Sequence, residues 1–180
     1  MLLLLTGLSI LGLTGYEDRN TAYPAVGDVF PLPAIERIEW LDGHQPGFGD
    51  KTLLINFWAT WCAPCRREMP DLQKLSETLD REKYAVIGIS VDEDRNLAEE
   101  FLLDNRIRFA NYWDHGQLIS SELLGIEAFP ATYIVAPDGS ILDRINGEQT
   151  WNEASFEASL NGRKLDGNLP SGSYATGERK

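Results

Sequence analysis

The stretch LLINFWATWCAPCRRE, residues 53–68, predicts more of the fold than any other part of the chain. Its first six residues form an apolar, strand-like run, and the segment after Cys62 has helical periodicity. Cys62 and Cys65 are therefore expected at the N-terminus of a helix, where unsatisfied backbone N–H groups and the helix dipole stabilise a thiolate. Because a thiolate is the nucleophile of disulfide exchange, the pair indicates redox chemistry.

Two other roles for the cysteine pair fit this setting less well. A structural disulfide across two residues closes a very short loop, so it restricts the unfolded chain much less than a long-range bridge does. A zinc site usually needs four ligands, whereas the chain offers only these two cysteines plus His44 and His115, without the spacing of a second ligand pair. We expect both histidines at the surface and predict no metal site.

The composition is that of an acidic globular protein. A length of 180 residues with 43% hydrophobic content is enough for one domain with a proper core. The net charge of -12 disfavours nucleic acid as a partner, because phosphate binding needs a basic surface. The chain has no Gly-rich phosphate loop, and no cofactor is predicted.

The N-terminus gives the prediction of compartment. Its first thirteen residues, MLLLLTGLSILGL, carry no charge. This run is too short to span a bilayer, but it suits the apolar core of a signal peptide or the end of a signal anchor. A buried first strand or helix is the alternative. We expect residues 1–15 to be a signal peptide or membrane anchor, and the protein to be periplasmic or otherwise extracytoplasmic.

The rest of the chain reads as a linker, one folded domain and a tail. Residues 16–33 contain three prolines and are expected to form an extended linker, residues 34–162 the domain, and residues 163–180 a disordered tail. Strands are predicted at residues 34–41, 51–59, 84–91, 109–113, 131–136 and 141–145. Helices are predicted after Cys62, around residues 97–102, and at residues 117–124 and 151–160. This alternation predicts an α/β fold whose mixed central sheet is flanked by helices and ends in an antiparallel hairpin.

Capping residues are predicted at three helix starts, namely Asp92 or Asp94, Asp114 with Gln117, and Thr150 with Glu153. The core face of the helix around residues 97–102 is expected at Leu97, Phe101 and Leu102. Three tryptophans are interpreted as core or edge packing residues, namely Trp40, Trp113 and Trp151.

With these features the chain resembles the thioredoxin superfamily, and within it the TlpA/ResA-like thiol–disulfide oxidoreductases of bacterial envelopes. The resemblance covers about residues 51–160 and rests on NFWATWCAPCRREMP at 56–70 and FPATYIVAPDGSI at 129–141. It implies a thioredoxin-like fold with an N-terminal strand or hairpin, and with residues 84–113 as an inserted strand–helix unit. It also implies that the N-terminal apolar segment is an export signal or anchor.

The resemblance gives the cysteine pair its roles as a redox-active disulfide. Cys62, at the exposed tip of the helix, is expected to attack, and Cys65 to resolve the mixed disulfide. Pro64 stiffens the first helical turn, where its missing N–H costs little. The positive charges of Arg66 and Arg67 are expected to favour the thiolate, although they are equally typical of a solvated helix face.

The residues expected to bind the substrate lie on either side of the cysteines. Trp61 is expected to pack over the dithiol and to shape the docking face. By the resemblance, Pro130 is a cis-proline that faces the cysteine pair, and the backbone beside it, at Phe129, pairs with the substrate chain as an added strand.

Glu68 is the third expected catalytic residue. Thioredoxin has a buried aspartate where this chain has Asn56, and asparagine cannot shuttle a proton. Glu68 follows Cys65 by three residues, hence on the same helix face, and TlpA/ResA-like proteins carry a glutamate there. Partial desolvation would raise its pKa towards the range of a proton shuttle. The alternative is an exposed glutamate in the first helical turn, stabilised by the helix dipole.

These residues predict a thiol–disulfide oxidoreductase that reduces disulfides of client proteins outside the cytoplasm. By the resemblance, a membrane thiol donor supplies the electrons, and cytochrome c maturation is the expected pathway. The alternatives are a disulfide oxidase or isomerase of the same fold, or a non-catalytic module that binds a metal or a partner. A peroxidase is disfavoured because the chain has no third cysteine. A monomer is expected, since such enzymes dock transiently.

Overall fold

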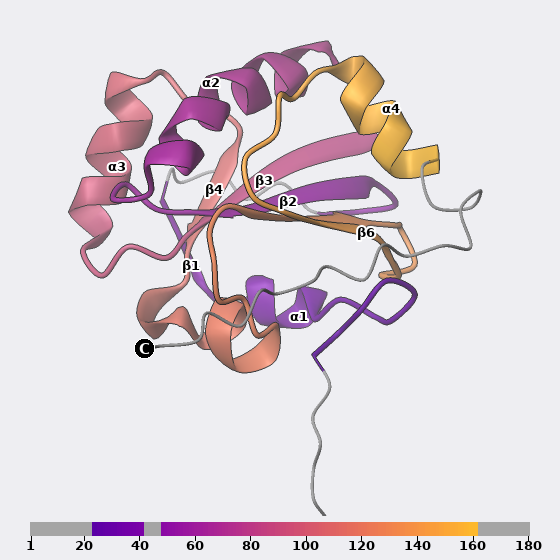
Figure 1. Cartoon of the computed structure of the whole chain (residues 1–180), viewed down its shortest axis with the longest axis horizontal. Coiled ribbons are helices and arrows are strands. Elements are labelled where there is room, and N and C mark those ends of the chain that lie inside the picture. The colour runs from indigo at the N-terminus through magenta and orange to yellow at the C-terminus, as the bar shows by residue number, and fades with distance from the viewer. Residues whose placement is uncertain (1–22, 42–47, 162–180) are drawn as a thin grey trace, which may run out of the picture.

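The structure, a computed structural model, describes residues 23–41 and 48–161. Six strands form one mixed sheet in the order β1-β4-β3-β2-β5-β6 (Figure 1). The strands are β1 (Glu39–Trp40), β2 (Thr52–Trp58), β3 (Tyr84–Ser90), β4 (Ala110–Trp113), β5 (Ala131–Val135) and β6 (Ile141–Asn146). Strands β2, β3 and β4 are parallel to one another, whereas β1 pairs antiparallel with β4, and the β5–β6 hairpin adds two antiparallel pairings beside β2.

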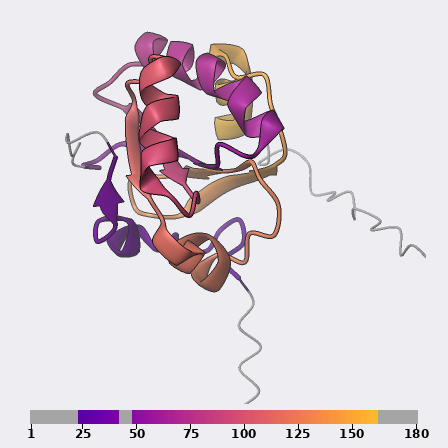
Figure 2. The ribbon, with the colours of Figure 1, turned by 90° about the vertical axis from the view of Figure 1, so that its left-hand side faces the viewer.

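Helices cover both faces of this sheet (Figures 1 and 2). One face carries α2 (Ala63–Thr78), α3 (Arg95–Asp104) and α4 (Glu153–Asn161). The other carries α1 (Leu32–Ile35), the 3-10 turn η1 (His115–Gln117) and the π-helix η2 (Leu118–Leu123). The predicted α/β fold, with its mixed sheet, its added N-terminal strand and its extra strand and helix at residues 84–113, is confirmed.

Strand β2 lies in the middle of the sheet, and its residues 53–58 are all buried. Side chains alternate along a strand, so neighbouring residues face opposite layers. Phe57 packs against Tyr133 in the layer that contains the N-terminal segment, while Trp58 packs against Phe101 of α3. Asn56 shares the face of Trp58, and it therefore points towards α2.

The N-terminal part of the domain differs from its prediction. Residues 34–41 do not form one strand, because α1 occupies the start of this segment and only the two residues of β1 pair with the sheet. Pro33 lies in the first turn of α1, where proline is well tolerated. Alternation over so few residues does not distinguish a strand from a short helical turn followed by a strand.

The described part of the predicted linker packs against the domain. Phe30 is only 1% exposed, and its ring contacts Tyr133 at a centroid distance of 5.2 Å. The backbone of residues 27–30 pairs with the β5–β6 hairpin, through Gly27 N–H to Ile141 O and Phe30 N–H to Gly139 O, both at 2.9 Å. The buried side chain of Phe30, together with these backbone hydrogen bonds, anchors a segment that its prolines and polar residues had suggested was a linker. The predicted signal segment, the tail and His44 lie outside the described residues.

Two of the predicted helix starts are wrong in detail. The positive φ angles of Gly116 and Gln117 separate η1 from η2, so the π-helix Leu118–Leu123 stands where a helix at residues 117–124 was predicted. Asp114 accepts hydrogen bonds from the N–H groups of Ile119 and Ser120, at 3.0 and 2.8 Å, and forms no capping box with Gln117.

Helix α4 begins at Glu153, two residues later than predicted. Asn152 and Ser155 exchange capping hydrogen bonds of 2.9 Å, in place of Thr150 and Glu153. The reason is that Trp151 is buried, so the chain reaches the core before the helix begins.

Helix α3 is capped by Asp94, one of the two residues predicted for this position. Its buried residues are Ala98 and Leu102, with Phe101 partly buried, whereas Leu97 is exposed. The predicted core face was therefore wrong at Leu97. Among the helices that the structure describes, none is long and apolar enough to cross a bilayer.

Candidate active site

Cys62 and Cys65 form a disulfide at the start of α2, with an S–S distance of 2.05 Å. Cys62 is the N-cap residue of the helix, and its Sγ accepts a hydrogen bond from the Cys65 N–H at 3.2 Å. In the reduced protein this N–H lies where it can stabilise a Cys62 thiolate. Pro64 lies in the first turn, where it leaves the helical hydrogen bonds intact.

The two cysteines differ in their access to solvent. Cys62 was expected at an exposed helix tip, but both cysteines are buried, with Cys65 0% exposed and Cys62 6% exposed. A partner thiol or disulfide therefore reaches Cys62 before Cys65. This asymmetry suits an exchange reaction in which one sulfur attacks and the other resolves.

A loop that is distant in the sequence, just before β5, lies against Cys62. The Phe129–Pro130 peptide bond is cis, and the Phe129 carbonyl oxygen lies 3.5 Å from Cys62 Sγ. Trp61 is 62% exposed, and its ring meets that of Phe129 edge-on at 5.9 Å. The structure thus brings Trp61 and Phe129 together beside the disulfide, although the described contact of Trp61 is with Phe129 and not with the sulfur atoms.

Glu68 lies one turn further along α2 and is only 1% exposed. Its Oε1 accepts a hydrogen bond from Asn56 Nδ2 at 2.7 Å. Its Oε2 accepts two more, from the Gln149 N–H at 3.0 Å and from Trp151 Nε1 at 3.3 Å. The alternative of an exposed first-turn glutamate is therefore wrong.

Burial is the largest influence on this carboxyl group, and it raises the pKa of Glu68 to about 7. The three hydrogen bonds favour the ionised form and hold the pKa below the value that burial alone would give. The nearby charge of Glu148 acts in the same direction as burial. Glu68 can therefore both accept and release a proton near neutral pH.

Asn56 ties Glu68 to the sheet. Its Nδ2 also donates a hydrogen bond to Thr132 Oγ1 of β5, at 2.9 Å. The asparagine that replaces the aspartate of thioredoxin thus fixes the position of the glutamate, and it carries no proton of its own to exchange.

The two arginines expected to favour the thiolate are both exposed. Arg67 donates hydrogen bonds to both carboxylate oxygens of Glu148, the first from Nε to Oε1 at 2.8 Å. The charge of Arg67 is therefore largely balanced by Glu148, and less of it acts on the cysteines than the sequence suggests.

Sequence reasoning missed two groups of residues around the site. Gln149 lies 81 residues from Glu68, so only the return of the chain after β6 brings them together. Trp151 was interpreted as a packing residue, yet its indole N–H binds Glu68. An indole that is buried close to a carboxyl group usually donates to it, but no spacing rule predicts this pairing.

The second group centres on Asp92, a buried carboxylate just after β3 that the sequence indicated only as a possible helix cap. It accepts hydrogen bonds from the N–H and the hydroxyl of Thr60, the latter at 2.6 Å, and from the Ser90 hydroxyl at 2.8 Å. Because Thr60 lies two residues before Cys62, Asp92 anchors the turn that carries the cysteine.

Within the described residues, no group of three or more His, Cys, Asp or Glu side chains could hold a metal ion. His115 packs against the ring of Trp113 at 4.7 Å. The chemistry that this geometry supports is thiol–disulfide exchange, with the exposed ring of Trp61 and the partly exposed ring of Phe129 beside Cys62, and with the buried carboxyl group of Glu68 one helical turn beyond Cys65.

Comparison with known proteins agrees with this geometry. The family model described as the AhpC/TSA family matches residues 44–144, more than half of the chain. The chain belongs to the AhpC/TSA family. A relative of this family member, the thiol-disulfide oxidoreductase ResA of Bacillus thuringiensis, is 31% identical over 152 residues, which cover 83% of this chain and 86% of that protein.

Solved structures of other thiol–disulfide proteins are also similar to this chain. A secreted thiol-disulfide isomerase from Corynebacterium glutamicum is 27% identical, with a TM-score of 0.59, over 68% of this chain and 80% of that one. A putative thiol:disulfide interchange protein DsbE from Chlorobium tepidum, at 21% identity and a TM-score of 0.62, covers 77% of this chain and 97% of that one, and it shows the shared fold. The predicted resemblance is confirmed, and the protein is a thiol–disulfide oxidoreductase with a thioredoxin-like fold.

Proposed function

We propose that this enzyme reduces disulfides in client proteins outside the cytoplasm. The observation that carries the direction of electron flow is the balance of charge around the cysteines. A strong oxidant of this fold stabilises its reduced, thiolate form. Here Arg67 is paired with Glu148, and a carboxyl group, Glu68, is buried one helical turn from Cys65. Both features oppose the stabilisation that the helix N-terminus gives the thiolate, and they therefore favour a reductant.

The catalytic cycle follows from the different exposure of the two sulfurs. The Cys62 thiolate attacks a client disulfide, a bond forms between Cys62 and one client sulfur, and the other client sulfur leaves as a thiolate that takes a proton from solvent. Glu68 then accepts the thiol proton of Cys65. The Cys65 thiolate attacks Cys62 Sγ, the Cys62–Cys65 disulfide forms, and the second client thiolate leaves. Two electrons have passed to the client.

Client binding is assigned to Trp61, Pro64, Phe129 and Pro130. An extended client segment can pair with the backbone at Phe129, whose carbonyl oxygen lies beside Cys62. The exposed ring of Trp61 and the partly exposed ring of Phe129 supply apolar contact surface on the same side. Because this contact is small, docking is transient, and the enzyme is proposed to act as a monomer.

The compartment and the pathway are inferred from the sequence and the relatives. The apolar residues 1–13 suit an export signal or a membrane anchor, and the isomerase from Corynebacterium glutamicum is described as secreted. We place the enzyme in the periplasm or another extracytoplasmic compartment, with a membrane thiol donor as its source of electrons. Apocytochromes, whose Cys-x-x-Cys-His sites must be reduced before haem attachment, are the proposed clients in cytochrome c maturation.

The test is electron transfer to a peptide that carries an oxidised Cys-x-x-Cys-His sequence. The reduced enzyme should convert the peptide to its dithiol in a stoichiometric reaction, and Cys65→Ser should stop at a mixed disulfide through Cys62. Cys62→Ser is the matched control and should form no such adduct. The proposal is wrong if the oxidised enzyme instead oxidises the dithiol peptide, the result expected of a disulfide oxidase.

A further inference from the structure

The loop of residues 147–152, between β6 and α4, provides two of the three hydrogen bonds to Glu68. The Gln149 N–H and Trp151 Nε1 both donate to Oε2, at 3.0 and 3.3 Å. The same loop is held to α2 by the ion pair between Arg67 and Glu148. Arg67, which precedes Glu68, and Glu148, which precedes Gln149, thus hold the loop over the carboxyl group.

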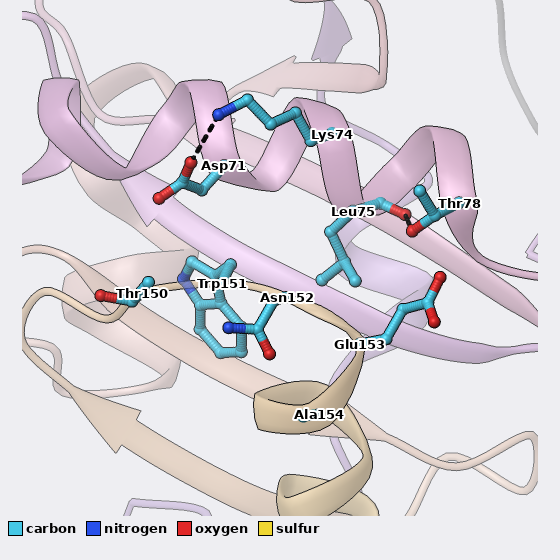
Figure 3. Close-up of a pocket in the computed structure, with 9 residues that line it drawn as sticks. All are labelled: Asp71, Lys74, Leu75, Thr78, Thr150, Trp151, Asn152, Glu153 and Ala154. Atoms are coloured by element: carbon cyan, nitrogen blue, oxygen red, sulfur yellow. Dashed lines mark hydrogen bonds and ion pairs between the residues drawn. The ribbon is translucent and has the colours of Figure 1, made fainter.

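Trp151 has a second neighbour besides Glu68. Its indole lines a pocket of about 540 Å³ between α2 and the start of α4, with Leu75 and Asp71 on the α2 side (Figure 3). The pocket is open to solvent, while Glu68 is only 1% exposed. The indole therefore lies between the carboxyl group and water.

We propose that Trp151 is a positioning residue for the acid–base chemistry of Glu68, with its ring excluding water from the carboxyl group and its N–H stabilising the ionised form. This inference rests on the proposed proton-transfer role of Glu68. The two actions of Trp151 oppose each other, because exclusion of water favours the protonated form and a hydrogen bond to the carboxylate favours the ionised form.

Few charged or titratable groups face Glu68 from the surrounding elements. On helix α2, Cys65 and Asp71 lie three residues before and after Glu68, and Asp71 is paired with Lys74. The loop contributes Glu148, whose charge opposes the ionisation of Glu68. Strands β2 and β5 contribute Asn56 and Thr132, which do not titrate. Trp151 is thus the loop side chain that stabilises the carboxylate.

The balance between exclusion of water and the indole hydrogen bond affects turnover, because it sets how readily Glu68 accepts and releases a proton. When Cys65 resolves a mixed disulfide, its thiol proton passes to the Glu68 carboxylate, the Cys65–Cys62 bond forms and the Cys62–client bond breaks. Glu68 must then release this proton to solvent before it can act again. A carboxyl group that is equally buried but lacks the indole N–H holds the proton more tightly and is ionised in a smaller fraction of molecules at neutral pH.

The test is an NMR titration of the side-chain carboxyl carbons of the oxidised, full-length protein labelled with 13C-glutamate. The Glu68 signal is identified by its absence from Glu68→Gln. Trp151→Phe keeps a ring but loses the N–H, so the Glu68 midpoint should rise by about one pH unit. Trp151→Ser admits water, so the midpoint should fall by about one pH unit or more. The control Trp113→Phe removes an indole N–H that donates to the Asp92 carbonyl, and it should leave Glu68 unchanged.

Opposite shifts in the two variants would support the inference, since a merely structural tryptophan shifts both in the same direction or neither. An unchanged or lowered Glu68 midpoint in Trp151→Phe would overturn the inference. If Trp151→Ser does not fold, the direction of the shift in Trp151→Phe is by itself the test. The oxidised protein contains no thiol, so these midpoints do not depend on whether the enzyme reduces clients. Failure of client reduction and failure of this inference are therefore separate results.

Discussion

At the scale of single residues, Glu68 shows how a fold can keep a carboxyl group ready to exchange a proton at neutral pH. Three donors surround it, and hydrogen bonds of this kind would normally lower the pKa of a carboxyl group. Burial outweighs them, and the pKa rises from 4.5 to about 7. The same burial means that ionisation of Glu68 lowers the stability of the folded state.

The first prediction concerns stability as a function of pH. Since the pKa of Glu68 is raised on folding, the native state binds this proton more tightly than the unfolded chain does, and stability falls as the pH rises between 4.5 and about 7. The loss at Glu68 amounts to about 3 kcal/mol. In urea unfolding of the oxidised protein, the free energy of unfolding of Glu68→Gln relative to the wild type should rise by that amount from the lower to the upper end of this pH range. Parallel pH profiles for the two proteins would contradict the raised pKa.

The second prediction concerns the rate of exchange. At neutral pH, Glu68→Gln should resolve mixed disulfides about 10²-fold more slowly, because general acid–base catalysis contributes roughly that much. The inflection of the pH–rate profile near 7 should disappear with it. Glu77→Gln, an exposed substitution on the same helix, is the control and should behave as the wild type. An inflection that survives in Glu68→Gln would assign the proton transfer to another group.

At the scale of elements, the segment that precedes β1 belongs to the folded domain. Phe30 is buried against Tyr133, while Val29 beside it is 70% exposed. We predict that Phe30→Ala lowers the free energy of unfolding by about 3–5 kcal/mol, the usual cost of removing a buried phenylalanine ring. Val29→Ala should change it by less than about 0.5 kcal/mol. Denaturant titration of both variants measures the difference, and equal, small effects would mean that residues 27–30 act as a linker after all.

The turn between β2 and α2 depends on an acceptor in a neighbouring strand. Asp92 receives the N–H and hydroxyl of Thr60 together with the Ser90 hydroxyl. Asp92→Ala leaves these donors without their acceptor, and we expect it to destabilise the protein by about 1–3 kcal/mol.

The same variant should also change the reactivity of Cys62, since Thr60 lies two residues before it. When the turn loosens, Cys62 is held less firmly at the helix N-terminus, and its thiolate is less stabilised. Alkylation of Cys62 in the reduced protein should therefore become slower near neutral pH. Asp94→Ala, which removes only the cap of α3, is the matched control. Equal alkylation rates in wild type and Asp92→Ala would restrict Asp92 to a structural role.

At the scale of the whole molecule, the sequence predicts what depends on local pattern and misses what depends on the return of the chain. The run from β2 into α2, the inserted β3–α3–β4 unit and the β5–β6 hairpin all carry clear periodicity, and all are present. The burial of Phe30 and the hydrogen bond from Trp151 to Glu68 were not expected, because each depends on a partner about 80 to 100 residues away. Glu68 could be proposed from its spacing to Cys65 and from the resemblance, but its partners Gln149 and Trp151 could not.

We propose that the net charge of -12 also weakens the stabilisation of a thiolate at the site. Arg67, one of the two arginines that follow Cys65, is paired with Glu148 and therefore offers a thiolate less stabilisation. The dithiol is then easily oxidised, which is the property of a reductant. We therefore propose that the whole charge distribution, and not the two cysteines alone, sets the direction of electron flow.

A glutathione redox titration of the Cys62–Cys65 pair in the purified protein measures this property directly. We predict a potential more negative than about -230 mV, towards the value of thioredoxin. A potential near about -120 mV, typical of a strong disulfide donor, would contradict the proposed reductase. Failure to form the disulfide at any glutathione ratio would contradict redox activity altogether.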